Sequence, residues 1–190
     1  MNAKTASIKT TTSSTTVGIL SDSHGYLDPR VAGVVNTCEF IIHAGDIFHG
    51  GILDQLTPAV ELIAVAGNND IPAVWSEEER ERVKALPLKA ELELPGGKLI
   101  VEHGHRLGNH PEHEQLRWDH AEARLVIYGH THHQVIDQEE SPWVVNPGAS
   151  GRVRTHGGPS CLILFASETD WRFETFRFSE QESQQQAVAG

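Results

Sequence analysis

The sequence TVGILSDSH at residues 16–24 is a short apolar run that ends directly at an Asp-x-His triplet. An apolar run of this length is typical of a buried strand. The pattern recurs in FIIHAGD at residues 40–46 and in ELIAVAGN at residues 61–68, where polar side chains again follow the run. Helices are predicted between these runs, at 28–37 and 52–56. Strands joined by helices imply a parallel sheet, with the polar residues gathered at the carboxyl edge of its strands.

The second half of the chain is predicted to contain more antiparallel strands. Residues 88–94 alternate apolar and polar side chains and lead into the turn Pro95-Gly96-Gly97, so we expect a hairpin with residues 98–102. The other predicted elements are helices at 76–84 and 111–123 and strands at 125–128, 135–137, 143–145, 161–166 and 172–178.

Length and composition indicate a single domain. With 190 residues, the chain can fill one hydrophobic core but is too short for two typical domains. We therefore predict one domain over residues 16–179, a solvated tail over residues 1–15 and a disordered tail over residues 180–190. The first tail is rich in Thr and Ser and lacks the apolar core of a secretory signal.

Charge and cysteine content argue against several kinds of partner. A formal net charge of −11 disfavours stable binding to nucleic acid or to an anionic membrane. No apolar run reaches the length of roughly 18 residues that a membrane span requires. A small phosphate substrate remains compatible with this charge, because bound divalent cations dominate the field inside a site. Cys38 and Cys161 are expected to be buried, reduced thiols of a cytoplasmic protein.

Metal-ligating residue types follow the predicted strands in five places. A lone Asp-x-His triplet is weak evidence for a metal site. Five fragments that carry metal-ligating residue types, in this order, indicate a two-metal hydrolytic centre. Glycine beside several of the ligands allows close approach of the backbone. The five fragments are Asp22-Ser23-His24, Gly45-Asp46, Gly67-Asn68-Asn69-Asp70, Glu102-His103-Gly104-His105 and Gly129-His130-Thr131-His132.

This order of motifs resembles that of the calcineurin-like metallophosphoesterases, and most of all their small single-domain phosphodiesterase branch. The resemblance extends from about Val17 to Phe178 and includes the segment Asn146-Pro147-Gly148-Ala149-Ser150. It implies an α/β fold of two packed mixed β-sheets flanked by helices, a four-layer sandwich. It also implies phosphodiester hydrolysis, in which a metal-bridging hydroxide at a dinuclear centre attacks phosphorus in line.

The resemblance implies seven ligands for two metal ions that share Asp46. Mixed nitrogen and oxygen ligands suit Mn²⁺, Fe²⁺, Co²⁺, Ni²⁺ or Zn²⁺ rather than Mg²⁺ or Ca²⁺, and Mn²⁺ is our first choice. The implied ligands are Asp22, His24, Asp46 and His132 for the first ion and Asp46, Asn68, His103 and His130 for the second.

The residues expected to act on the substrate include one departure from the family. Many members carry a histidine directly after the asparagine ligand, but this chain has Asn69, which can contact substrate and cannot carry a proton at neutral pH. His105 could supply that proton or contact substrate, or it could orient its neighbours. Arg152 is a predicted phosphate contact, with a solvated arginine as the alternative. The predicted catalytic residues are Asp46, Asn68, His103 and His105.

Residues beside the motifs have simpler interpretations. Asp70 is expected to support the ligands rather than to bind metal. His43 lies inside an apolar run, which favours a buried position from which it orients the ligands. His110, His113 and His120 could share a helix face, and an exposed polar face is favoured over a third metal site.

Three functions are consistent with these features. The first is a metal-dependent phosphodiesterase that acts on small phosphate esters. The second is a phosphomonoesterase with the same centre. The third is a non-catalytic scaffold of the same fold, like the retromer subunit that resembles this family, although the intact set of ligands argues against it. A homodimer is compatible with the exposed loops and hairpins.

Overall fold

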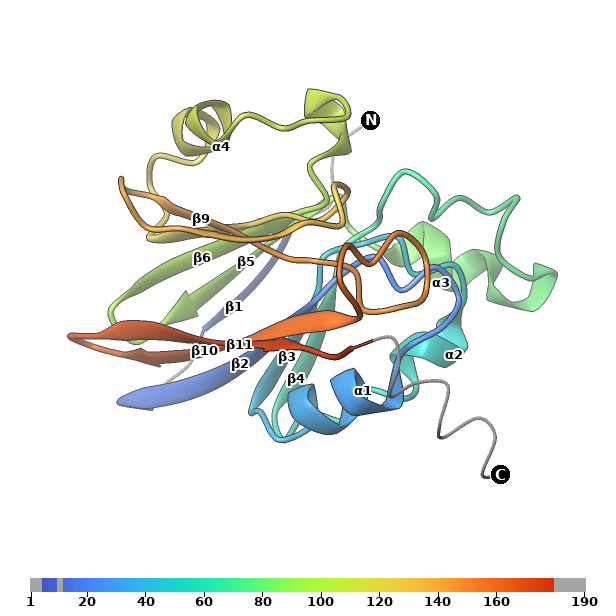
Figure 1. The fold of residues 1–190 in the computed structure, drawn as a ribbon, viewed down its shortest axis with the longest axis horizontal. Coiled ribbons are helices and arrows are strands. Elements are labelled where there is room, and N and C mark those ends of the chain that lie inside the picture. Colours follow the sequence, from blue (N-terminus) through green and yellow to red (C-terminus); the bar gives the residue numbers. More distant parts are fainter. Residues whose placement is uncertain (1–4, 10–11, 180–190) are drawn as a thin grey trace.

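The computed structural model describes residues 5–9 and 12–179, which form two packed β-sheets with helices on their outer faces (Figure 1). One sheet has six strands and the other has five, and each contains both parallel and antiparallel neighbours. The predicted α/β fold of two packed mixed sheets flanked by helices is therefore confirmed. The six-stranded sheet contains, in spatial order, β1 (Thr5–Lys9), β5 (Lys89–Leu94), β6 (Gly97–Glu102), β7 (Leu125–Ile127), β9 (Trp143–Pro147) and β8 (Gln134–Asp137).

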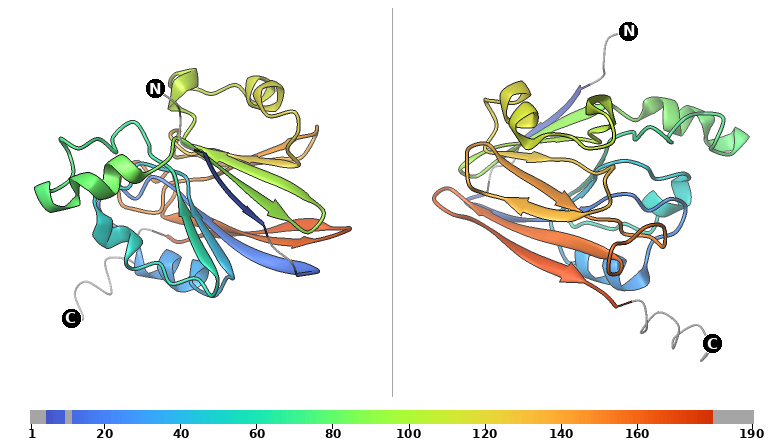
Figure 2. Two further views of the ribbon diagram at one scale, coloured as in Figure 1. Left: turned by 180° about the vertical axis from the view of Figure 1, so that it is seen from behind. Right: turned by 45° about the horizontal axis from the view of Figure 1, so that its top comes forward.

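Helices cover both outer faces. Figure 2 shows α4 (His113–Asp119) over the six-stranded sheet and α1 (Pro29–Val35) with α2 (Gly50–Leu53) under the five-stranded sheet. None of the described helices is long and apolar enough to cross a membrane. The five-stranded sheet contains, in spatial order, β11 (Trp171–Arg177), β10 (Ser160–Ser167), β2 (Ser14–Leu20), β3 (Phe40–His43) and β4 (Glu61–Ala64).

Residues that alternate along β2 explain why this strand is apolar on both faces. Ile19 faces the core between the sheets, where it belongs to one buried cluster with Leu99 of the opposite sheet. Leu20 points the other way and packs with Val31 of α1. Successive side chains of a strand point to opposite faces of its sheet. A strand that is covered by the second sheet on one face and by a helix on the other must therefore be apolar throughout.

The helix predicted after the first strand begins as its sequence indicates. Asp28 caps α1, because its carboxylate accepts a hydrogen bond from the backbone N–H of Arg30, and Pro29 occupies the first turn. Farther along, the predicted helix at 76–84 is divided into a 3₁₀ turn, η1 (Glu77–Glu79), and α3 (Arg80–Ala85). A second 3₁₀ turn, η2 (His105–Leu107), follows β6.

β1 lies in the segment that was expected to be a solvated tail, and for Thr5–Lys9 that expectation is wrong. The strand pairs in parallel with β5, and Ile8 packs against the core between the sheets. The partner strand lies far along the chain, so local composition could not reveal the pairing. The rest of both predicted tails, at 1–4, 10–11 and 180–190, lies outside the described residues.

Loops from both sheets meet at one end of the sandwich. Within the five-stranded sheet, β2, β3 and β4 run parallel, so their carboxyl ends share one edge. The loop after β9 joins them, because Ser150 donates through its backbone N–H to the carbonyl of Ser21 at 2.9 Å. Gly129, after β7, donates to the carbonyl of His103 at 3.2 Å. All five polar fragments found in the sequence therefore gather at this edge.

Candidate metal centre

The predicted ligands are held by an unusual backbone. Non-glycine residues rarely adopt positive φ, and each such residue costs on the order of 1–3 kcal/mol that surrounding contacts must offset. Here the loops are fixed by hydrogen bonds between them, such as Asp22 N–H to the Gly45 carbonyl at 2.9 Å. Five predicted ligands adopt positive φ, namely Asp22 (53°), His24 (46°), Asp46 (57°), His130 (68°) and His132 (62°).

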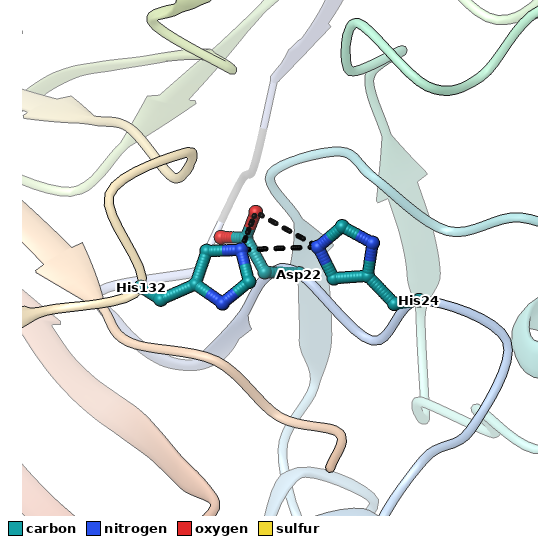
Figure 3. A group of neighbouring side chains, drawn as sticks. All are labelled: Asp22, His24 and His132. Atoms are coloured by element: carbon teal, nitrogen blue, oxygen red, sulfur yellow. Dashed lines mark hydrogen bonds and ion pairs between the residues drawn. The ribbon is translucent and has the colours of Figure 1, made fainter. Parts of the chain in front are cut away.

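Asp22, His24 and His132 form the first candidate metal site (Figure 3). The Nε2 atoms of the two histidines face each other at 3.0 Å, and Asp22 Oδ1 lies 3.4 Å from that of His132. His132 Nδ1 donates to the Val153 carbonyl at 2.8 Å, which leaves a lone pair on Nε2 in the neutral ring. Two facing nitrogens beside a carboxylate need a proton or a cation between them, so this set fits a metal ion.

Asp22, Asp46 and His103 form a second candidate site that shares Asp22 with the first. His103 Nδ1 donates to the Ala44 carbonyl at 2.7 Å, so its Nε2 also faces the carboxylates. Nε2 lies 3.5 Å from Asp46 Oδ2 and 3.9 Å from Asp22 Oδ1, and it is buried without a hydrogen-bond partner among the described residues. A buried orphan nitrogen facing two carboxylates is the donor arrangement expected for a divalent transition metal.

Glycine is required beside these ligands because the loops touch. A Cβ on Gly67 would overlap the Asp46 carboxylate. Gly45 has a φ of +97°, and a Cβ there would lie 2.7 Å from His103 Nδ1. The Gly-Asp and Gly-Asn pairs in the sequence therefore reflect the close packing of three loops around one centre.

The loop after β4 places Asn69, rather than Asn68, against the centre. Asn69 donates to Asp46 twice, from its backbone N–H at 2.9 Å and from its side-chain amide at 2.8 Å. Asn68, the predicted ligand, is exposed. The cause is a tight turn in which the Asp70 carboxylate accepts the Gly67 N–H at 2.8 Å, so that the intervening residues turn Asn69 inward.

Asp70 supports the centre from behind, in keeping with the prediction. Its carboxylate accepts hydrogen bonds from the backbone N–H groups of Ile47 and Phe48, each at 3.0 Å, and from the Trp75 indole at 3.1 Å. His43 acts similarly, since its buried Nε2 lies 3.0 Å from Ser23 Oγ. Burial lowers the pKa of His43 to about 3, so this ring is neutral. Both residues fix the loops that carry the ligands.

His105 and His130 lie beside His103. The ring centroids of His130 and His105 are 5.2 Å and 5.4 Å from that of His103. The backbone N–H of His130 donates to Asp22, at 3.0 Å from Oδ2. The Nδ1 atom of His105 is buried without a hydrogen-bond partner among the described residues. Both predicted residues are therefore at the rim of the second site, next to its ligands.

The two arginines of the loop after β9 take different positions. The Arg152 guanidinium stacks on Tyr26, 3.5 Å from the ring centroid. Arg154 Nη2 instead lies 3.1 Å from His132 Nε2. Sequence reasoning favoured Arg152 as the phosphate contact, but the structure brings Arg154 to the centre, because Arg154 has a φ of 49° that redirects its side chain.

The three histidines near α4 do not gather into a site. His110 is exposed, whereas His113 lies between Asp137, at 2.6 Å, and the Tyr128 hydroxyl, at 3.0 Å. His120 is buried, 3.6 Å from the Glu102 carboxylate. The expectation of one exposed polar face is therefore wrong for His120, because α4 ends at Asp119 and His120 leaves the helical path.

The pKa values of the two carboxylates of the centre are shifted in opposite directions. Burial, only partly offset by His103, raises the pKa of Asp22 to about 7. Burial also acts on Asp46, but the nearby His103 imidazole and hydrogen bonds from Asn69 outweigh it and hold the pKa of that carboxyl well below its usual value. For His132, burial and then the charge of Arg154 lower the pKa to about 4, although its bond to the Val153 carbonyl opposes them. A neutral His132 near pH 7 keeps its lone pair available for a metal ion.

Comparison with known proteins gives the family. Residues 16–169 match the calcineurin-like phosphoesterase superfamily domain. A phosphodiesterase of Methanocaldococcus jannaschii is 26% identical over 166 residues, which cover 82% of this chain and 96% of that protein.

Solved structures with a similar fold agree with this family assignment. An archaeal phosphodiesterase superposes with a TM-score of 0.63 at 26% identity, covering 85% of this chain and 99% of that chain. Vacuolar protein sorting 29 of Cryptosporidium parvum superposes with a TM-score of 0.66 at 14% identity, covering 88% and 99%, and this likeness shows the fold alone. The chain belongs to the calcineurin-like phosphoesterase superfamily, a family of metal-dependent hydrolases.

Proposed function

We propose that this protein hydrolyses phosphodiesters at a centre of two divalent metal ions, with Mn²⁺ as the first candidate. One observation carries the proposal: two carboxylate–histidine groups share Asp22, and the Nε2 atoms of their histidines all face its carboxylate. The phosphodiester class is supported by the similarity to the Methanocaldococcus jannaschii phosphodiesterase. Two adjacent ions suit the in-line displacement of a phosphate ester.

The residues would divide the work as follows. Asp22, His24 and His132 would hold one ion, and Asp46 and His103 the other. Asp46 Oδ2 lies 3.6 Å from His24 Nε2 as well as 3.5 Å from His103 Nε2, so it can reach both. When bound, the ions would activate a water molecule and neutralise charge on the phosphoryl oxygens.

The loop residues shape the chemistry around that step. Asn69 donates one backbone and one side-chain N–H to Asp46, which orients the carboxylate, and its amide cannot give a proton to a departing oxygen near neutral pH. His105, beside His103, is the ionisable side chain that could serve there. Diesters with good leaving groups should therefore react faster than those with poor ones.

The test is a rate comparison on two substrates. The protein is stripped of metal and loaded with Mn²⁺, and hydrolysis of bis-p-nitrophenyl phosphate is compared with that of p-nitrophenyl phosphate. Turnover of the diester that chelation abolishes supports the proposal. Faster turnover of the monoester favours the phosphomonoesterase alternative. No turnover with Mn²⁺, Ni²⁺, Co²⁺ or Zn²⁺ favours the scaffold.

The setting of the reaction is also a proposal. We propose a small phosphate ester as the substrate. We also propose that the protein acts in the cytoplasm, because Cys38 and Cys161 are buried free thiols, as expected. Homodimer formation stays a prediction, and size-exclusion chromatography with light scattering tests it.

A further inference from the structure

Arg154 lies in a loop, residues 151–158, that is pressed against the ligand-bearing end of β2. Ser150, just before the loop, donates through its hydroxyl to the Ser21 carbonyl at 2.7 Å. A Cβ on Gly151 would overlap the Ser23 carbonyl. The backbone of the loop is therefore already in close contact with the segment that carries Asp22 and His24. Figure 1 shows this orange loop beside the blue loop that carries Asp22 and His24. The position of Arg154 is therefore set by the same contacts that build the centre.

The loop holds His132 at both ring nitrogens. Nδ1 donates to the Val153 carbonyl at 2.8 Å, and the Arg154 guanidinium lies 3.1 Å from Nε2. Arg154 adopts a φ of 49°, a backbone conformation that a non-glycine residue keeps only when its surroundings stabilise it. A guanidinium is thus held at the very nitrogen that we assign to a metal ion.

Arg154 also differs from most other arginines in having no carboxylate partner among the ion pairs of residues 5–9 and 12–179. Arg30 pairs with Asp28 at 2.9 Å, and Arg106 pairs with Glu102 at 2.8 Å. Arg154 is exposed, and its guanidinium lies against the neutral His132. An exposed cation without an anionic partner, at the mouth of a hydrolytic centre, is suited to an anion from solution.

We propose that Arg154 binds a phosphoryl oxygen of the substrate, an inference that rests on the proposed function. Its planar guanidinium can donate two parallel hydrogen bonds to phosphate oxygens, which a lysine cannot do. To give its lone pair to a metal ion, His132 must release Arg154, whose charge then opposes the cation until an anion bridges them. Phosphate and metal should therefore strengthen each other's binding through Arg154, as linkage between two ligands requires.

The experiment measures binding as well as turnover. Titration calorimetry follows inorganic phosphate binding to the Mn²⁺-loaded protein, and Mn²⁺ binding to the metal-free protein with and without phosphate. Arg154→Ala should weaken phosphate binding by about 10–100-fold, the usual range for a lost charge-assisted pair. Mn²⁺ binding without phosphate should be unchanged or tighter. Arg154→Lys should fall between the wild type and Arg154→Ala, since it keeps the charge but loses the fork.

Arg152→Ala is the matched comparison, because it removes the same charge from the same loop while Arg152 stacks on Tyr26. It should change phosphate affinity by no more than about twofold, the small effect of an exposed charge. Equal phosphate affinity in Arg154→Ala and the wild type would overturn the inference. So would an equal loss in both variants, or a loss of Mn²⁺ binding in Arg154→Ala, which would indicate that Arg154 only holds His132.

The outcomes separate this inference from the proposed function. If the Mn²⁺-loaded wild type binds phosphate but hydrolyses no ester, the proposed function fails, and the phosphate affinity of Arg154→Ala still decides the role of Arg154 as a phosphate contact. If the wild type hydrolyses the diester and Arg154→Ala binds phosphate equally well, only the inference fails. A wild type that binds no phosphate overturns the inference directly.

Discussion

Glu102 and His103 are neighbours in the chain, yet they belong to two histidine–carboxylate clusters of opposite character. In the outer cluster, Glu102 accepts hydrogen bonds from Nε and Nη2 of Arg106, each at 2.8 Å. Arg106 also reaches Asp119 at 2.6 Å. In the inner cluster, His103 faces Asp22 and Asp46 at 3.5 Å or more.

The difference is the presence of a cation. Burial alone would raise the pKa of Glu102, but the adjacent His120 imidazole and hydrogen bonds from Arg106 outweigh it and lower this pKa to about 2. Burial raises the pKa of Asp22 to about 7, because His103 offsets it only in part. Buried carboxylates are stable as charges only beside a cation. The outer cluster contains its own cation and is complete, whereas the inner cluster is suited to cations from solution.

The largest expected effect follows from neutralising the inner cluster. Asp46→Asn should reduce phosphodiester hydrolysis by about 10³-fold or more, because the lost carboxylate reaches both candidate sites and metal ions supply several kcal/mol of transition-state stabilisation. The fold should survive, since the amide has the size of the carboxylate and Asp22 still faces His103. Steady-state kinetics and circular dichroism measure the two effects. Persistent activity would show that Asp46 does not bridge the ions.

The outer cluster should respond in stability instead. Glu102→Gln should lower the free energy of unfolding by about 2–3 kcal/mol at pH 7, since it removes the carboxylate beside His120 and one of the two that pair with Arg106. Because the folded-state pKa is depressed to about 2, this stabilisation is present above the ordinary pKa of glutamate and is lost as pH falls toward 2. Urea denaturation at pH 7 and pH 3 measures it. Glu77→Gln, at an exposed pair with Arg80, is the control and should change little.

Asp70 tests whether a carboxylate that only supports the inner cluster, and is not a predicted ligand, affects metal binding. Asp70→Asn should weaken Mn²⁺ binding by about 10–100-fold, the range found when a supporting partner of a metal site is lost. The amide would direct N–H groups at the backbone N–H groups of Ile47 and Phe48. Calorimetric titration measures the loss. Asp54→Asn, an exposed carboxylate paired with Arg82, serves as control, and an equal loss there would contradict the assignment.

Measured per pH unit, the smallest effect is the pH dependence of metal affinity. Burial raises the pKa of Asp22 to about 7, and burial of His103 is outweighed by Asp46 and Asp22, which raise the pKa of that imidazole. Protons on these groups compete with metal, so Mn²⁺ affinity should rise about tenfold or more per pH unit between pH 5 and 7 and then level off. Calorimetry across this range tests the slope. A flat profile would mean that Asp22 is ionised throughout.

Strand positions could be predicted from the sequence because each strand is buried on both faces or alternates regularly. The runs at 16–21, 40–44 and 61–66 became β2, β3 and β4 with shifts at their ends only. The edge at which the ligands gather followed from the parallel order of these strands. β1 could not be predicted, because its pairing with β5 depends on a distant segment.

The directions of side chains within loops could not be predicted from the sequence. Whether Asn68 or Asn69 turns inward depends on hydrogen bonds from the loop backbone to Asp70 and Asp46. Whether Arg152 or Arg154 reaches the centre depends on one left-handed residue. Motif spacing gives neither, since the residue types are the same in each pair. The residue types of a centre are thus readable from sequence, whereas their exact assignment depends on loop geometry.

The most direct test of the central claim is the number of divalent ions that the inner cluster takes up. Metal-free protein is titrated with Mn²⁺ at pH 7.5 in a calorimeter, with Asp46→Asn alongside. Two ions should bind to each wild-type chain, and the affinity should fall markedly in the variant. Wild-type binding no tighter than about 1 mM, or binding that Asp46→Asn leaves unchanged, would contradict it.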